Sequence, residues 1–364
     1  MITFLINRWT PINRLDFREI LLIRLDHLGD LVWCLESIRN LRGHFPTARI
    51  TALIGEWNLE FFKGSPDVDE VLIYNSPAFT RSRPRITSRR QRLRILRRLR
   101  SERYDLVIGF RDDAFTIGAS LLICPRARVD RGTTRIRKKL YPRLRAVTWH
   151  ESDTNAAIVA PVLRARHAPG RGSAIERLLF FSEEEDQWLN EFLHKHRMRR
   201  KMFAILHPGA AWPYRRWNPA NFSRVAAFLY ERYGLKSIVL GTRDESDVGA
   251  RVIGDRPALF VNATGETTLR QMMLLISQAR IAVCNDSGPA HLSAILRTPT
   301  IVLLGPEDVA RFAPRGSQII CFHKKLECHP CAQVTCKYPE NPCVNLNTVE
   351  EILQAIPELM GTRS

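Results

Sequence analysis

The chain has 364 residues, is 45% hydrophobic and carries a formal net charge of +18 at pH 7. This length can bury a large core and favours two domains over one. No stretch approaches the roughly 18 to 20 consecutive apolar residues of a membrane span. The first residues, MITFLINRWTPINR, lack the apolar core and cleavage site of a signal peptide. We therefore expect a soluble, cytoplasmic protein.

The positive charge is concentrated in one block. Residues 81–145 hold 21 Arg and Lys against five acidic residues. Such a block suits nucleic acid, an anionic membrane surface or a phosphorylated ligand, and a solvated helix face without a partner is the alternative. A nucleic-acid-binding protein is the weaker interpretation, because no aromatic-studded basic strand or recognition-helix motif accompanies the charge.

The first half of the chain alternates strand and helix patterns. Short apolar runs predict strands at residues 19–25, 49–54, 71–74 and 104–110, and an Arg-rich helix around 92–103 precedes the last of them. Strands separated by helices indicate a parallel sheet with crossover helices.

The second half repeats the pattern without repeating the sequence. Strands are predicted at residues 203–206, 237–240, 259–261, 280–284 and 300–304. Asn218 can cap a helix that begins at Pro219, and Asn347 can cap a final helix over 348–359. Residues 164–177 have the Pro, Gly and charge of a linker. Two doubly wound halves follow, an α/β fold.

Three polar loops follow predicted strands, where open parallel sheets bind their ligands. They are Asp26–Asp30, His207–Arg216 and Asn285–His291. None contains a phosphate-binding G-x-x-x-x-G-K-[ST] motif or a G-x-G-x-x-G motif, which argues against an NTPase or a simple dehydrogenase.

Each loop has a functional and a structural interpretation. Asp30 is either a helix cap or a carboxylate that takes a proton from a hydroxyl group. In the second loop, Gly209 permits close approach of a ligand and Arg215 neutralises phosphate, or the arginine is an ordinary surface residue. In the third, Gly288 opens a helix whose free N–H groups bind an anion, or the segment is a capped turn.

Four of the eight cysteines form a C-x2-C-x4-C-x6-C cluster, Cys328, Cys331, Cys336 and Cys343. Four thiolates within sixteen residues can reach one zinc ion, although the middle and last gaps do not match a common zinc template. Reduced thiols or a disulfide in a structured loop are the alternatives. The other four cysteines suit small core positions.

The segments ILLIRLDHLGDLV, LHPGAAWPYRRWNPANF, GTRDE and CNDSGPAHLSAILRTPTIVLLGPEDVARFAP, in this order, resemble those of glycosyltransferase family nine, the heptosyltransferases of lipopolysaccharide core synthesis. The resemblance covers about residues 19–352. It implies a GT-B architecture, two Rossmann-like domains facing across a cleft. Residues 1–172 would bind the acceptor, residues 173–346 would bind the nucleotide sugar, and residues 347–364 would form a helix that packs back on the N-terminal domain.

The resemblance also implies the chemistry. Members transfer heptose from ADP-heptose with inversion and require no metal or other cofactor, so the cysteine cluster would be structural. Asp30 matches the catalytic aspartate of the family, and Arg215 matches a basic residue, usually lysine, at the donor phosphates. Asp286 is predicted to be catalytic together with Asp30 and Arg215. It would accept hydrogen bonds from the sugar hydroxyls of the donor, or orient its own loop. The remaining predicted donor-binding residues are Gly209, Glu245 at the ribose, Thr267 near the adenine, Ser287, Gly288 and His291.

The same resemblance implies a function for the basic block, residues 81–145. Lipopolysaccharide core acceptors carry phosphates and carboxylates at the inner leaflet, so a cationic N-terminal domain would concentrate the enzyme there. Arg111 and Arg24 are the predicted acceptor-binding residues. We expect peripheral association with the inner membrane. Another nucleotide sugar or another glycan acceptor is the alternative within the family.

Overall fold

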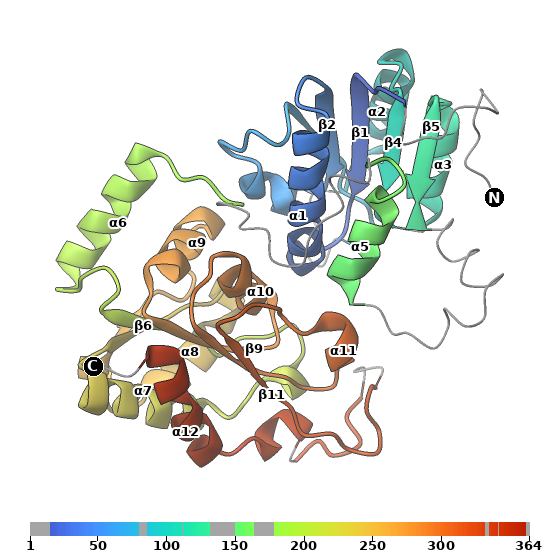
Figure 1. The fold of residues 1–364 in the computed structure, drawn as a ribbon. Coiled ribbons are helices and arrows are strands. Elements are labelled where there is room, and N and C mark those ends of the chain that lie inside the picture. Colours follow the sequence, from blue (N-terminus) through green and yellow to red (C-terminus); the bar gives the residue numbers. More distant parts are fainter. Residues whose placement is uncertain are drawn as a thin grey trace. The chain divides into compact units, whose positions relative to one another are not determined.

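The computed structural model describes residues 15–79, 86–111, 113–131, 150–163, 178–331, 335–340 and 342–361. The chain divides into two compact units, Met1–Phe180 and Phe181–Ser364. Each unit is built on one parallel β-sheet with helices beside it (Figure 1). The predicted linker and the predicted boundary at 172/173 lie outside the described residues.

The first unit contains a five-stranded sheet in the order β3-β2-β1-β4-β5. Its central strand β1 is buried from Ile20 to Arg24 and pairs in parallel with both neighbours. The elements of this unit are β1 (Glu19–Arg24), α1 (Leu28–His44), β2 (Arg49–Ile54), a 3-10 helix (Glu56–Phe61), β3 (Glu70–Ile73), α2 (Arg89–Ser101), β4 (Leu106–Gly109), α3 (Ala114–Ile123), β5 (Ala127–Asp130) and α5 (Glu151–Val159).

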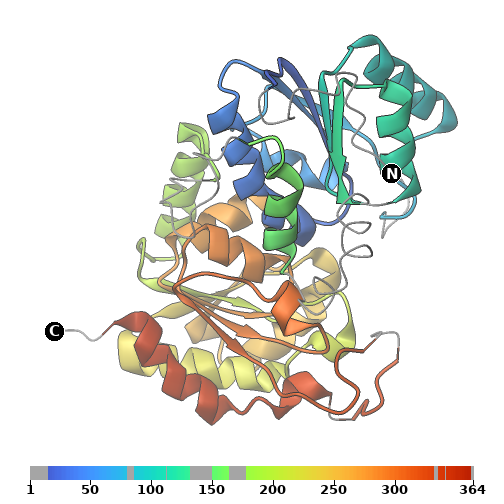
Figure 2. The ribbon, with the colours of Figure 1, turned by 45° about the vertical axis from the view of Figure 1, so that its right-hand side comes forward.

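The second unit contains a six-stranded parallel sheet in the order β11-β10-β9-β6-β7-β8 (Figure 2). Its elements are α6 (Glu183–Lys195), β6 (Phe203–His207), α7 (Pro219–Tyr233), β7 (Lys236–Val239), α8 (Ser246–Ile253), β8 (Phe260–Asn262), α9 (Leu269–Gln278), β9 (Ile281–Asn285), α10 (Gly288–Ile295), β10 (Thr300–Leu303), α11 (Val309–Phe312), β11 (Ile319–Phe322) and α12 (Val349–Met360). Short 3-10 helices lie at Pro213–Arg215, Arg243–Glu245, Pro257–Leu259 and Cys343–Leu346.

Every predicted strand is present, within one or two residues of its expected bounds. The sequence did not reveal β5 and β11, which are edge strands of their sheets. Strand β5 reads ARVD, so its apolar run is interrupted by charge, and the residues of β11 are only half-buried. Edge strands need less apolar sequence than central ones, because one side pairs with no other strand.

The caps of two helices test the local predictions. Asn218 caps α7 as expected, because its side chain accepts a hydrogen bond from Ala220 N. The final helix instead begins one residue later than Asn347 implied. Thr348 is its cap, and Asn347 donates a hydrogen bond to Val344 O. None of the described helices is long and apolar enough to cross a membrane.

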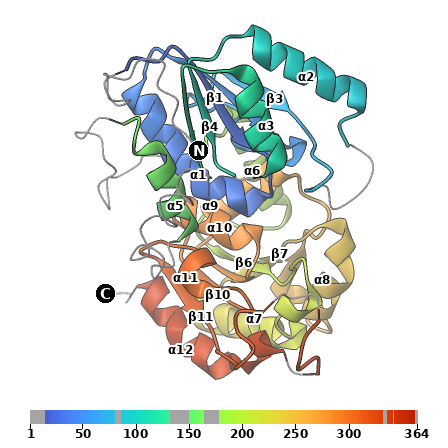
Figure 3. The ribbon, with the colours of Figure 1, turned by 90° about the vertical axis from the view of Figure 1, so that its right-hand side faces the viewer.

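Helix α12 buries its apolar face in the core of the second unit. Its packing on the N-terminal domain stays a prediction. Val349, Ile352 and Ile356 belong to that core. The helix lies beside α7, β10 and β11 (Figure 3). The start of the helix is anchored by Trp217 Nε1, which donates a hydrogen bond to Asn347 O at 2.9 Å. The large apolar face of α12 therefore completes this sheet's own helix layer.

Candidate active site

Two of the three polar loops are neighbours because their strands are. Strands β6 and β9 pair in parallel with His207 opposite Cys284, so the loops that begin at His207 and Asn285 leave the same edge of the sheet. The third loop, Asp26–Asp30, follows β1 in the first unit. The three polar loops therefore form two sites, one in each unit.

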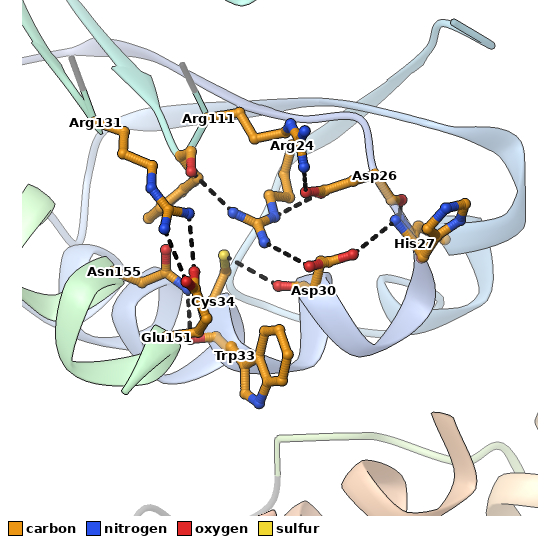
Figure 4. A network of polar contacts seen from close by, with 12 residues as sticks. Arg24, Asp26, His27, Asp30, Trp33, Cys34, Arg111, Arg131, Glu151 and Asn155 are labelled. Carbon is orange, nitrogen blue, oxygen red and sulfur yellow. Dashed lines mark hydrogen bonds and ion pairs between the residues drawn. The ribbon is translucent and has the colours of Figure 1, made fainter. Parts of the chain in front are cut away.

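Asp30 lies on the first turn of α1 (Figure 4). Its Oδ2 atom accepts a hydrogen bond from His27 N at 3.2 Å, and its Oδ1 atom lies 3.4 Å from Arg24 Nη2. The side chain keeps 26% of its surface exposed. Asp30 thus serves as a helix-terminal acceptor, as the structural interpretation predicted, and still presents a carboxylate to solvent.

The surroundings of Asp30 make it an unusually strong base for a carboxylate. Burial, followed by the negative charge of Asp26, raises its pKa to about 6, although Arg24 and Arg111 act in the opposite direction. The group is ionised at neutral pH and accepts a proton more readily than an ordinary aspartate. This is the property required of a general base that works near pH 7.

Arg24 is placed differently from its predicted role. Its side chain is only 2% exposed, its Nε atom lies 2.7 Å from Asp26 Oδ1, and its Nη1 atom donates to Phe110 O at 2.9 Å. The guanidinium is therefore used within the unit, and burial withholds its charge from an acceptor. Arg24 instead contacts Asp26 and Asp30. Its position at the end of β1 did not indicate these partners.

Arg111 follows β4 and has the exposure that Arg24 lacks. Its Nη1 atom donates to Asp26 Oδ2 at 2.8 Å, and its guanidinium lies 4.6 Å from the centre of the Phe79 ring. The side chain is 33% exposed. Arg111 is held in place from two sides and can present positive charge to an anionic group.

In the second unit, Asn285 joins the two neighbouring loops. Its Nδ2 atom donates to Pro208 O at 2.7 Å, and its Oδ1 atom accepts from Trp217 N at 3.1 Å. A further contact of 3.2 Å connects Ser287 Oγ to His207 Nδ1. Because Asn285 is fully buried, these bonds fix the backbone around Gly209 and around the start of α10. Asn285 lies in one of the predicted polar loops, but its sequence position indicated no function.

Arg215 lies between two carboxylates. Its Nη1 atom is 3.6 Å from Asp286 Oδ2, and its Nη2 atom pairs with Glu307. Burial raises the pKa of Asp286 to about 6, with Arg215 opposing the rise and Glu307 adding to it. Glu307 was not among the predicted site residues. Its position soon after β10, at the edge where ligands bind, is the signal that could have found it.

The Glu245 carboxylate occupies the space that a side chain at position 209 would need. A Cβ atom at Gly209 would lie 2.2 Å from Glu245 Oε1, so only glycine lets the carboxylate approach this loop. Thr242 N fixes the other oxygen, Oε2, by donating to it at 2.8 Å. The structure thus brings Glu245 to the loop that also carries Arg215.

The remaining predicted donor residues occupy helix starts in the same unit. Ser287 is the N-terminal cap residue of α10, Gly288 is its first residue, and His291 is buried in the same helix. Thr267 is half-buried and directly precedes Thr268, the cap of α9. Residues 286–288 belong to the joined loops, whereas Thr267 stands apart from them after β8.

All eight cysteines are free. Cys328, Cys331, Cys336 and Cys343 line one pocket together with Tyr214 and Pro306. Across the described ranges, no group of three or more His, Cys, Asp or Glu side chains is arranged to hold a metal ion. The predicted zinc site is therefore not supported among these residues, and none of the four cysteines is paired in a disulfide.

Solved structures with the same architecture identify the class of fold. A glycosyltransferase family 9 protein from Veillonella parvula aligns over 95% of this chain and 98% of its own, with a TM-score of 0.79 and 20% identity. The E. coli ADP-heptose lipopolysaccharide heptosyltransferase II aligns over 94% and 98%, with a TM-score of 0.70 and 20% identity. These likenesses confirm the predicted GT-B fold class.

Sequence comparison defines the family. The model of glycosyltransferase family 9 (heptosyltransferase) matches residues 92–341, so the chain belongs to this family. Lipopolysaccharide heptosyltransferase 3 of Escherichia coli K12 is 24% identical over 81% of this chain and 84% of its own length. Lipooligosaccharide heptosyltransferase 2 of Campylobacter jejuni is 24% identical over 43% of this chain, and the match spans 50% of that relative.

Proposed function

We propose that the protein transfers heptose from ADP-heptose to an anionic acceptor of the lipopolysaccharide core, with inversion at the anomeric carbon and Asp30 as the general base. The observation that carries the proposal is the accessible Asp30 carboxylate, whose pKa is raised to about 6. Family membership supports the donor class, and the names of the related heptosyltransferases support the acceptor class.

The reaction needs one proton acceptor and one leaving group. Asp30 takes the proton from an acceptor hydroxyl, whose oxygen forms a bond to the anomeric carbon of heptose. The bond from that carbon to the diphosphate oxygen breaks, and ADP leaves with the bonding electrons. Attack from the face opposite ADP inverts the configuration. These steps need no metal or cofactor.

The second unit holds the donor in this mechanism. Arg215 and the free N–H groups at the start of α10, around Ser287 and Gly288, stabilise the negative charge that develops on the diphosphate. Glu245 accepts hydrogen bonds from ribose hydroxyls, Thr267 lies at the adenine, and His291 supports the helix start. Asp286 accepts hydrogen bonds from the sugar, because an ionised carboxylate next to phosphate is unfavourable.

A direct assay tests the reaction. Incubation with ADP-heptose and a truncated Kdo-lipid acceptor should release ADP and add the mass of one heptose to the acceptor. UDP-glucose and ADP-glucose, supplied with the same acceptor, test the alternative of another donor sugar. Absence of ADP release and of the mass increase with ADP-heptose contradicts the heptosyl assignment, and transfer from another donor replaces it.

We also propose that the enzyme associates peripherally with the cytoplasmic face of the inner membrane through α2. Leu99 is buried in the core of the first unit, while Ile95 and Leu96 pack against that core. The opposite face exposes Leu93, at 55%, among basic side chains. The exposed arginines of this face are Arg89, Arg90, Arg94, Arg97 and Arg100.

This surface combines the two contributions that hold a peripheral helix on a membrane. Arginines one turn from Leu93 attract anionic headgroups, and the leucine side chain can enter the acyl boundary. Arg98 differs from its neighbours, because it pairs with Glu70 and Glu102 and stabilises the unit itself. Residues 81–85, 112 and 132–145 of the basic block lie outside the described residues.

Neutralising this face should weaken membrane binding. Replacing Arg89, Arg90, Arg94 and Arg97 by Gln should reduce binding to vesicles that contain anionic phospholipid at least about tenfold, since each basic residue contributes about 1 kcal/mol at such a surface. Sedimentation at increasing salt measures the effect.

The matched control replaces four exposed arginines of the second unit by Gln, Arg199, Arg232, Arg251 and Arg256. It removes the same charge and should leave vesicle binding close to wild type. If both variants lost vesicle binding equally, net charge alone would explain the loss. That result would contradict a role for α2.

A further inference from the structure

We propose that Asp26 is a positioning residue of the transfer reaction, whose buried carboxylate holds Arg24 against the base Asp30 and holds Arg111 toward the acceptor. This inference rests on the proposed role of Asp30. It assigns a function to a residue that touches neither substrate and lies between the two arginines that sequence analysis had grouped together (Figure 4).

The side chain of Asp26 is 1% exposed, and its two oxygens serve different arginines. Oδ1 lies 2.7 Å from Arg24 Nε, and Oδ2 accepts from Arg111 Nη1 at 2.8 Å. A buried carboxylate is stable only when its charge is compensated in this way. Asp26 therefore depends on both arginines, and each arginine depends on it.

The backbone of Asp26 is fixed as firmly as its side chain. Its carbonyl oxygen accepts a hydrogen bond from Trp57 Nε1 at 2.7 Å and another from Asn58 Nδ2 at 2.9 Å. Both donors come from the 3-10 helix after β2. The carboxylate is thus anchored to the neighbouring strand connection, so it can define where the two guanidinium groups lie.

Arg24 carries this order on to Asp30. With Nε at Asp26 and Nη1 bonded to Phe110 O, its remaining nitrogen Nη2 points to Asp30 Oδ1 at 3.4 Å. This contact is longer than the Asp26 contact, so Asp30 keeps part of its basicity. A guanidinium without Asp26 would be free to pair closely with Asp30 and would weaken it as a base.

Other charged groups near Asp30 are already satisfied among themselves. Glu151, from α5, pairs through both oxygens with Arg131 at 2.8 Å, and the Cys34 thiol contacts Asp30 O. Burial raises the pKa of that thiol to about 12, so it stays protonated. Asp113 Oδ2 lies 3.8 Å from Arg111 Nε. Asp26 is therefore the acid that balances the arginines next to Asp30.

The test is the pH profile of kcat/KM for Asp26→Asn. Removing this negative charge lowers the pKa of Asp30, since Asp26 raises it while Arg24 and Arg111 lower it. The acidic limb, expected near pH 6 in the wild type, should move down by about one pH unit or more. We expect kcat at pH 8 to fall about tenfold, because a weaker base accepts the proton less readily. The acceptor KM should rise as Arg111 loses its partner.

The matched control is Asp67→Asn. Asp67 is a buried aspartate of the same unit that pairs with Arg39 Nε at 2.6 Å. This variant should lose a similar amount of folding stability, but the acidic limb of its pH profile should stay at the wild-type position. Arg111→Gln provides a second measurement at a partly exposed position. It removes a positive charge near Asp30 and should move the limb upward, opposite to Asp26→Asn.

An unmoved limb in folded Asp26→Asn, or in Arg111→Gln, overturns the inference. Loss of activity without a shift would likewise reduce Asp26 to a structural residue. Failure of the underlying function gives a different result, because Asp30→Asn would then keep the wild-type activity and the wild-type acidic limb.

Discussion

Asp30→Asn should lower turnover by about 100-fold to 10,000-fold, the range that general-base catalysis contributes. The amide keeps the size of the side chain and can still accept the hydrogen bond from His27 N, but it cannot take a proton. The wild-type kcat/KM should rise with pH through about 6, as Asp30 ionises, and this limb should disappear in the variant. Steady-state kinetics between pH 5 and 9 measures both effects.

The same substitution should not destabilise the protein at alkaline pH. The pKa of Asp30 is raised in the folded state, so its protonated form favours folding. This contribution is full below the unfolded-state pKa and is lost as the pH rises through about 6. At pH 8 the asparagine therefore removes an unfavourable buried charge. We expect an unfolding temperature equal to or above that of the wild type, measured by calorimetry.

Asp153→Asn is the matched control. Asp153 is exposed and is the third residue of α5, whose N-terminal cap is a histidine. Asp30 is likewise the third residue of α1, which also has a histidine as its N-terminal cap. Its replacement should leave turnover unchanged. ADP binding, measured by titration calorimetry, should stay near the wild-type value in both variants. Turnover retained by Asp30→Asn would remove Asp30 as the base.

Arg215→Ala should reduce kcat/KM about 100-fold to 1,000-fold, as the loss of one preorganised charge at a developing anion does in other enzymes. Donor affinity should fall as well, because the arginine is proposed to contact the diphosphate in the ground state. The loss also leaves Asp286 and Glu307 without their shared cation. The pKa of Asp286, which Arg215 holds down, should then rise further.

Two variants separate this role from a general loss of charge. Arg215→Lys keeps the charge but replaces the planar fork by a point charge, and should recover most of the activity. Arg224→Ala removes an arginine from an exposed pair with Glu350 and should be neutral, since surface ion pairs contribute little. Unchanged kinetics in Arg215→Ala would mean that the donor does not contact this side chain.

Most of the predictions that depended on local pattern were confirmed, although the cap of α12 is Thr348 and not the predicted Asn347. Strand β2 has the expected bounds, Asn218 caps α7, and the loop after β1 places Asp30 on the first turn of a helix. Apolar runs, cap residues and loop composition act within a few positions of the chain, so the sequence carries them directly. The edge strands β5 and β11 were missed because their pattern is weak.

Contacts between distant segments were not accessible in this way. Arg111 and Arg24 were both predicted to bind the acceptor, with Arg111 as the first candidate, yet Arg24 is buried and Arg111 is partly exposed. The partners Asp26, Asn285 and Glu307 acquire their roles only when neighbouring strands bring their loops together.

The packing of α12 shows the same difference between what local pattern predicts and what tertiary contacts decide. Its amphipathic sequence predicted a helix that must bury one face, but not the surface that would receive it. The core of the second unit accepts that face, because Trp217 anchors the start of the helix there.

The sequence by itself thus determined the α/β class and the order of elements through local periodicity, and the resemblance of its motifs to glycosyltransferase family nine supplied the candidate base. Only the tertiary structure decided which charges are buried, which arginine can meet an acceptor and which carboxylates share a cation. Those outcomes depend on burial and on through-space distances of a few ångströms, which order along the chain does not specify.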